Sequence, residues 1–197
     1  MRLTKFIGIL ILALCGCQTV VERERPNDIR YRDAAPVEMT ALIEALLDLK
    51  GVCVQSVEGA WKDHAFAAQM VMKGDGERAT LVFLAPQMRL ATVTLTRPHA
   101  LKFEHVPQIP QAFEPEYMLA DFAFINLETE TLRRVCGSQL KIVDDGPCRT
   151  IALADGTPLA ELTYQSDGTM CYRNRIYGYE YILQTESRTL SSGGTRR

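Results

Sequence analysis

The amino-acid sequence predicts an α+β fold built on one large antiparallel sheet, and three observations support this class. Apolar side chains recur with helical spacing over residues 39–47. Apolar and polar side chains alternate with a period of two over much of residues 66–104, and again after residue 139. A stretch with helical features, residues 115–135, separates these two runs of strands. Strands that are grouped in runs, rather than alternating singly with helices, favour an antiparallel sheet.

The composition is that of one globular domain. The chain has 197 residues, of which 47% are hydrophobic and 23% charged, and its formal net charge is −2. This length is sufficient for a single domain with a substantial core. Proteins that bind nucleic acid carry clustered Lys and Arg, so the near-neutral balance argues against a nucleic-acid partner.

The first residues have the features of an export signal that ends in a lipidation site. Two basic residues precede the apolar run 6–14, which is too short to span a bilayer because a spanning helix needs about 20 residues. Residues 14–17, Leu-Cys-Gly-Cys, resemble the bacterial lipobox. We therefore expect residues 1–16 to be a lipoprotein signal peptide and Cys17 to receive the lipid. The alternative is a plain secretory peptide with two incidental cysteines.

The expected lipid determines the expected location and the domain boundaries. A cysteine with three acyl chains is a stable anchor, because each buried methylene contributes about 0.8 kcal/mol. Gln18 follows the cysteine, whereas Asp at this position favours inner-membrane retention in enteric bacteria, so we expect the outer membrane, facing the periplasm. Residues 17–34, with Pro26, are expected to be the anchor and a charged tether, residues 35–186 the folded domain, and residues 187–197 a disordered tail.

The first helix and a meander of strands are predicted in the first half of the chain. The helix over residues 39–47 has apolar residues at i, i+3, i+4, i+7 and i+8 and lies between Pro36 and Gly51. Strands follow near residues 66–73, 79–84, 91–96 and 101–104, with residues 73–77 as a turn.

Two short helices and a second run of strands are predicted in the other half. Pro115 opens a helix that carries apolar residues on one face to residue 125. A third helix is expected from Glu128 to Val135, and Gly137 ends it. The strands then expected lie at residues 139–143, 149–154, 159–164, 170–175 and 177–183, with turns at Asp155-Gly156 and Asp167-Gly168.

Four cysteines remain in the folded part: Cys53, Cys136, Cys148 and Cys171. An oxidising periplasm would permit one or two disulfides among them, in three full pairings that the sequence does not separate, and buried free thiols are the alternative. No pair has zinc-finger spacing and no His lies close by in sequence, so no metal site is expected.

Motifs of catalysis are missing from the sequence. It contains no G-x-S-x-G, no H-E-x-x-H and no phosphate-binding glycine loop, and its three histidines stand alone. We therefore expect neither enzymatic activity nor a cofactor. Tyr177, Tyr179 and Tyr181 share one face of a predicted strand, where they would pack in the core or form the floor of a pocket.

Several short motifs occur in an order that is typical of one bacterial family. Residues 159–168 read Leu-Ala-Glu-Leu-Thr-Tyr-Gln-Ser-Asp-Gly, residues 132–135 read Leu-Arg-Arg-Val, and residues 84–95 hold a Leu-Ala-Pro hairpin and strand. These segments resemble LolB, the outer-membrane receptor that accepts lipoproteins from a periplasmic carrier. With residues 119–121 and 177–179, the pattern is closer still to a LolB-like branch of lipoproteins of unknown function.

The resemblance covers about residues 50–186 and implies an incomplete, strongly curved antiparallel barrel of the LolA/LolB type, with helices over its mouth. Its apolar interior would bind the acyl chains of a lipid or lipoprotein cargo, and a periplasmic carrier protein would be a partner. Exposing a sixteen-carbon chain to water costs about 13 kcal/mol, so a carrier has to keep the chain covered. Each candidate lining residue could instead belong to an ordinary hydrophobic core. The candidates are Phe66, Met70, Met72, Leu81, Phe83, Val93, Leu95, Phe103, Met118 and Phe122.

One departure from LolB concerns the loop that inserts into the membrane. LolB carries an exposed leucine in a P-L-G hairpin, whereas the matching residues here are Pro86, Gln87 and Met88, so Met88 is the candidate membrane-contact residue. Members of the branch often lie beside genes for fatty-acid-like or aryl-polyene synthesis, which suggests a different lipid as cargo. The alternative function is a structural or assembly lipoprotein that binds a protein partner and is linked to aryl-polyene lipid export.

Overall fold

The computed structural model describes residues 18–31, 36–61, 64–107 and 114–192. Within these ranges, three helices accompany twelve strands. The helices are α1 (Thr40–Leu47), α2 (Pro115–Asn126) and α3 (Thr129–Cys136). The strands are β1 (Thr19–Arg23), β2 (Leu49–Trp61), β3 (His64–Asp75), β4 (Arg78–Ala85), β5 (Met88–Thr96), β6 (Ala100–His105), β7 (Leu140–Asp144), β8 (Cys148–Leu153), β9 (Pro158–Tyr164), β10 (Met170–Asn174), β11 (Tyr179–Arg188) and β12 (Ser191–Ser192).

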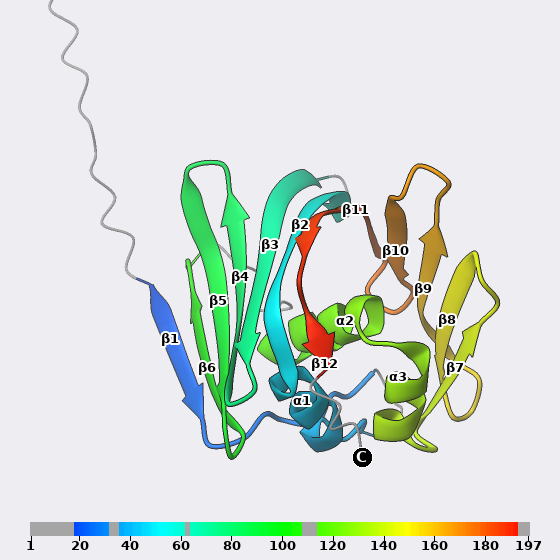
Figure 1. The fold of residues 1–197 in the computed structure, drawn as a ribbon, viewed down its shortest axis with the longest axis horizontal. Coiled ribbons are helices and arrows are strands. Elements are labelled where there is room, and N and C mark those ends of the chain that lie inside the picture. Colours follow the sequence, from blue (N-terminus) through cyan, green and yellow to red (C-terminus); the bar gives the residue numbers. More distant parts are fainter. Residues whose placement is uncertain (1–17, 32–35, 62–63, 108–113, 193–197) are drawn as a thin grey trace, which may run out of the picture.

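The strands form one antiparallel sheet that does not close. Their order is β1-β6-β5-β4-β3-β2-β11-β10-β9-β8-β7, and β12 pairs with β2 off this path. Figure 1 shows the sheet bent around the helices, with β4, β5 and β6 on one side of α2 and β7, β8 and β9 on the other. The predicted open, curved antiparallel sheet is therefore confirmed, although the chain is mostly β, so that α+β describes it only approximately.

The three predicted helices are all present. Helix α2 begins at Pro115, and Gly137 follows α3 with a φ of 53°, a backbone conformation that glycine adopts without strain. Helix α1 is fixed to the turn between β5 and β6 by Arg97, which pairs with Glu44 and, at 2.7 Å, with Asp48. Within the described ranges, no helix is long and apolar enough to span a membrane.

The expectation of a free tether is wrong for much of its length. Residues 19–23 form β1 and pair with β6 at the edge of the sheet, and Ile29 and Tyr31 are buried. The charged composition indicated a solvated linker, but Val21 has an apolar face of the sheet to pack against once β6 is in place. Residue 17 and residues 32–34 lie outside the described part of the chain.

The expectation of a disordered tail from residue 187 is also wrong at its start. Strand β11 continues to Arg188 beside Cys53, and Ser191 pairs with Lys50. This pairing joins residues more than 130 positions apart, so the local sequence carries no sign of it. Residues 193–197 lie outside the described ranges.

Helix α3 lies against β7, the last strand of the sheet. The Arg133 Nε–H donates to the backbone carbonyl of Ile142 at 3.1 Å, and the Thr129 hydroxyl donates to Asp144 at 2.5 Å. A side chain from the helix thus occupies a backbone acceptor of the edge strand.

Candidate functional site

The inner face of the sheet carries rows of apolar side chains that cross several strands. In one row Leu81 pairs with Met72 and Val93, and Val93 pairs in turn with Phe103. Directly paired residues of an antiparallel sheet point to the same face, so these four side chains form a continuous strip. All four are buried in the main hydrophobic cluster.

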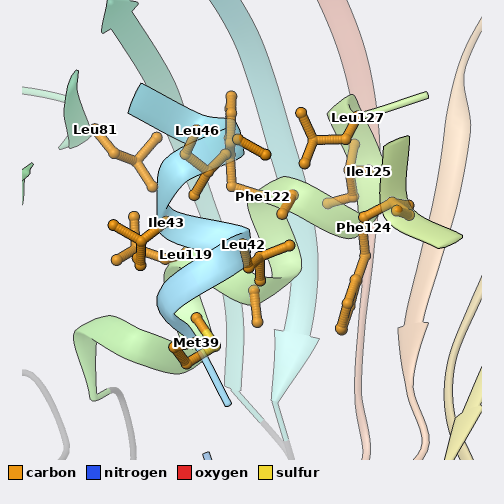
Figure 2. Close-up of a cluster of buried hydrophobic side chains, with 14 of the residues drawn as sticks. Met39, Leu42, Ile43, Leu46, Leu81, Leu119, Phe122, Phe124, Ile125 and Leu127 are labelled. Carbon is orange, nitrogen blue, oxygen red and sulfur yellow. The ribbon is translucent and has the colours of Figure 1, made fainter. Parts of the chain in front are cut away.

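Helices α1 and α2 cover this face. Figure 2 shows α1 with Leu42 and Leu46 beside α2, whose Leu119 and Phe122 belong to the same buried cluster as Leu81 of β4. Ten of the twelve residues of α2 are buried, which is typical of a helix enclosed on all sides rather than lying on a surface. We call the space enclosed by the inner face of the curved sheet the hollow; α2 occupies it (Figure 1).

Three polar residues of α2, Glu116, Asp121 and Asn126, interrupt its apolar sequence at intervals of five. Five residues turn a helix by about 140° beyond a full turn, so the three side chains leave α2 in different directions. Each finds a partner on a different part of the fold.

Asp121 meets a cluster of tyrosines from β10 and β11. The hydroxyls of Tyr172 and Tyr179 donate to its two carboxylate oxygens, and Asn174 donates to the Tyr179 hydroxyl at 2.9 Å. Tyr181 stacks on Tyr172 with ring centroids 5.0 Å apart. Burial raises the pKa of Asp121 to about 6, and the tyrosine hydrogen bonds act in the opposite direction.

The C-terminal end of α2 is held by two arginines. Arg149 donates to the carbonyls of Phe124 at 2.8 Å and Leu127 at 2.9 Å, and Arg188 donates to the Asn126 carbonyl at 2.8 Å. Positive charge at this end is favourable because the last carbonyls of a helix carry partial negative charge. The Asn126 amide also donates to Gln55 of β2 at 3.2 Å.

The N-terminal end of α2 is held by the segment that contains β1. Arg23 pairs with Glu116, and the Asn27 backbone N–H donates to the same carboxylate at 3.0 Å. The Tyr117 hydroxyl donates to the Arg30 carbonyl at 2.8 Å. Polar contacts therefore fix α2 at both ends and in the middle, while its apolar side chains fill the hollow.

Nine of the ten predicted lining residues lie together in or against this hydrophobic cluster, and whether they contact a ligand stays a prediction. Phe83 and Met118 are partly exposed members of the group, and Phe66 differs because it is 37% exposed. Phe66 lies opposite Gly59 in the register of β2 and β3. A Cβ atom on Gly59 would stand 2.5 Å from Cβ of Tyr181 and 3.0 Å from Cζ of Phe66, so the absence of a side chain at residue 59 lets both aromatic residues lie against the backbone there. The seven fully buried members are Met70, Met72, Leu81, Val93, Leu95, Phe103 and Phe122.

The other two predicted site residues have different outcomes. Met88 is 48% exposed at the start of β5, directly after the turn that contains Gln87, so an apolar side chain does project from this hairpin. Cys17 lies outside the described residues. A surface depression of about 390 Å³ lies along β1, β5 and β6, and its lining includes none of the predicted residues.

The four remaining cysteines are free thiols in the structure, so the alternative of unpaired cysteines holds for them. Cys53 and Cys136 are buried, whereas Cys148 and Cys171 are half-buried and lie on either side of Thr163 in the register of β8, β9 and β10. Burial raises the pKa of Cys136 to about 11, which keeps that thiol protonated at neutral pH. Among the residues described, no three His, Cys, Asp or Glu side chains gather as a metal site would require.

Sequence reasoning missed the role of the polar residues in α2. Tyr179 and Tyr181 were expected on one face with Tyr177, and Tyr179 does reach the hollow, but its partner Asp121 is 58 residues away. The available signal was the presence of three polar residues in a helix that is otherwise apolar. A buried helix tolerates such residues only when each has a partner, so they indicate contacts that local patterns do not reveal.

The comparisons with known proteins agree with the expectation of a family of unknown function, whereas the likeness to LolB itself stays a prediction. None of the curated proteins is similar enough to match the chain. Among solved structures, the chain is similar to a Vibrio parahaemolyticus domain whose name assigns it to outer membrane lipoprotein sorting, with 10% identity and a TM-score of 0.41 over 74% of this chain and 86% of that chain. The model of the family described as "Protein of unknown function (DUF3261)" matches residues 52–187, more than half of the sequence, and the chain therefore belongs to that family.

Proposed function

We propose that this protein is a non-catalytic carrier, anchored by lipid at Cys17 to the outer membrane and facing the periplasm. In this proposal it binds the acyl chains of a lipid or lipoprotein during transfer to that membrane. The observation that carries the proposal is the open, curved sheet whose apolar inner rows are covered by helices and not by a second sheet. A helix can leave such a face without breaking any strand pairing.

An acyl chain can replace α2 because both present apolar surface to the same rows. A sixteen-carbon chain gains about 13 kcal/mol on leaving water, which is of the order needed to offset lost helix contacts. Met70 and Met72 lie in the inner face, and their flexible thioether side chains adapt to ligands of irregular shape. The inner apolar rows of the sheet then stay covered both with and without cargo.

The environment of Asp121 supports a function without catalysis. Its pKa of about 6 would suit a general acid or base, but both carboxylate oxygens accept hydrogen bonds from Tyr172 and Tyr179. Both oxygens are therefore already engaged, within a buried cluster. We propose that the network positions α2 and takes no part in a reaction.

The test uses the full-length protein, purified from membranes, and two matched variants of β4. Leu81→Phe enlarges a side chain on the inner face, and Val82→Phe makes a similar change on the outer face of the same strand. We expect the wild-type protein to release acyl lipid on extraction, measured by mass spectrometry, and to bind a fluorescent sixteen-carbon fatty acid. Leu81→Phe should weaken probe binding by about tenfold, since overpacking costs about 1–3 kcal/mol, while Val82→Phe should leave it unchanged.

A protein without extractable lipid that also ignores the fatty-acid probe would overturn the proposal. In that case cross-linking that captures one protein partner would favour the assembly function. If the two β4 variants bind the fatty-acid probe equally well, the lipid does not bind in the hollow. Circular dichroism before and after binding shows whether each variant is folded.

A further inference from the structure

The segment from Thr19 to Tyr31, which we call the arm, joins the edge of the sheet to the first turn of α2. Its first part is β1, which pairs with β6 from Thr19 opposite His105 to Arg23 opposite Leu101. Its last part is buried at Ile29 and Tyr31. The arm begins two residues after Cys17, the proposed anchor.

All polar contacts between the arm and α2 fall on two neighbouring residues of the helix. Arg23 and the Asn27 N–H both bind the Glu116 carboxylate, the latter at 3.0 Å. Tyr117 donates to the Arg30 carbonyl at 2.8 Å, and its ring meets that of Tyr31 edge-on at a centroid distance of 5.7 Å. The first turn of α2 is thus held from one side by a single short segment.

Glu116 makes the position of α2 depend on this segment. Its residue is only 1% exposed, and within the described residues its second carboxylate oxygen has no hydrogen-bond partner. A buried carboxylate needs a paired cation, and Arg23 supplies the one recorded for it. Loss of Arg23 would leave this charge with the Asn27 N–H alone, so the buried position of the first turn of α2 would become less favourable.

The first part of the arm, β1, is less firmly held than its last part, where Ile29 and Tyr31 are buried in the core. Strand β1 has five residues and lies at the edge, paired only with β6, and short edge strands open at lower free energy than central strands. We propose that the arm is a latch: docked on β6, it keeps α2 in the hollow, and when it peels from β6 it releases the N-terminal turn of α2 and opens the acyl site. Access to cargo is then controlled by the segment next to the lipid anchor; this regulation rests on the proposed function, whereas the control of α2 does not.

A disulfide between the arm and β6 tests the latch. Glu22 and Lys102 are opposite each other in the register, where Cα atoms lie within disulfide range, and they are on the outer face, away from the hollow. The variant, which we call the arm lock, is Glu22→Cys with Lys102→Cys in the full-length chain. The matched control is Lys73→Cys with Thr80→Cys, a pair in the same outer row that joins β3 to β4.

Weakening the latch should have the opposite effect. Arg23→Gln removes the cation on Glu116, and Arg25→Gln makes the same change at an exposed position of the arm. Hydrogen–deuterium exchange measures the opening of α2 directly, and the uptake rate of the fluorescent fatty acid measures access. We expect the oxidised arm lock to slow both by at least tenfold, and Arg23→Gln to speed both by about tenfold, since a hydrogen bond between charged groups contributes roughly this factor.

Hydrogen–deuterium exchange of α2 tests the latch without any ligand. If the oxidised arm lock and Arg23→Gln leave this exchange equal to that of their control variants, the latch is refuted, even if the fatty acid binds. If exchange responds as expected but no variant takes up the fatty acid, the latch is supported and the proposed function fails. Reduction of the lock should restore wild-type exchange, and failure to do so would show that the variant damages the fold instead.

Discussion

The buried carboxylate of Asp121 should make the stability of the protein depend on pH in an unusual direction. Burial raises its pKa to about 6 in the folded protein, against about 3.9 for Asp in an unfolded chain. The folded state therefore binds the proton more tightly. Its contribution to the free energy of unfolding is largest below the unfolded pKa and is lost as the pH rises through 6.

The size of the effect follows from the two pKa values. One unit of pKa difference corresponds to about 1.4 kcal/mol. Between pH 7.5 and 4.5 the change runs over about 1.5 units below the folded pKa, so the Asp121 contribution should rise by about 2 kcal/mol as the pH falls. Paired surface carboxylates such as Asp144, whose pKa is lowered chiefly by its hydrogen bond to Thr129, change stability in the opposite direction.

The variant Asp121→Asn isolates the contribution, because it keeps the shape of the side chain and cannot titrate. Urea unfolding of both proteins at several pH values gives the difference between their free energies of unfolding. This difference should shift in favour of the wild-type protein by about 2 kcal/mol from pH 7.5 to 4.5. A difference that stays constant, or shifts toward the variant, would refute the reasoning. Tyr172→Phe, which removes a hydrogen bond that lowers the pKa of Asp121, should move the step to higher pH.

Three further outcomes are expected. Leu46→Ala, at a fully buried position of α1, should lower the free energy of unfolding by about 2–5 kcal/mol, whereas Ile182→Ala, at an exposed position, should change it by less than about 0.5 kcal/mol; urea unfolding measures both. Cys17→Ser should abolish labelling by radioactive palmitate and release the protein from membranes on fractionation, and retained labelling would contradict the proposed anchor. In the Cys17→Ser background, which lacks the proposed anchor, Met88→Gln should keep the melting temperature and reduce binding to anionic vesicles, and equal binding would exclude Met88 from membrane contact.

Much of the fold was predictable because many strands alternate apolar and polar side chains. The places of Val93 and Phe103 in one apolar row could be predicted from this period of two, whereas Leu81 lies in a nearly continuous apolar run that predicts a strand but not its inner face. Pro115 and Gly137 marked helix ends through their own backbone preferences. Such signals are local and do not depend on distant parts of the chain.

The predictions from sequence were wrong at segments whose structure depends on strands far away in the chain. Residues 19–23, Thr-Val-Val-Glu-Arg, begin a charged segment, and they pair as a strand because β6, some 80 residues later, offers an edge. The same holds for the end of β11, which continues along β2. Within the candidate site, the pattern of apolar residues predicted the apolar rows. The hydrogen bonds that hold the middle of α2, however, join Asp121 to Tyr172 and Tyr179, which are more than 50 residues away in the sequence. No local pattern encodes such a contact.

An open sheet has the lasting risk that foreign chains add to its ends and build fibres. At one end Arg133 occupies the carbonyl of Ile142, which makes β7 a poor template for another strand. At the other end the protein supplies the added strand itself, because β1 takes the place on β6 that a foreign strand would need. Each excursion of the arm therefore uncovers Leu101–His105, the five residues of β6 that pair with β1, and the cell has to keep such molecules apart or bring a chosen strand to them.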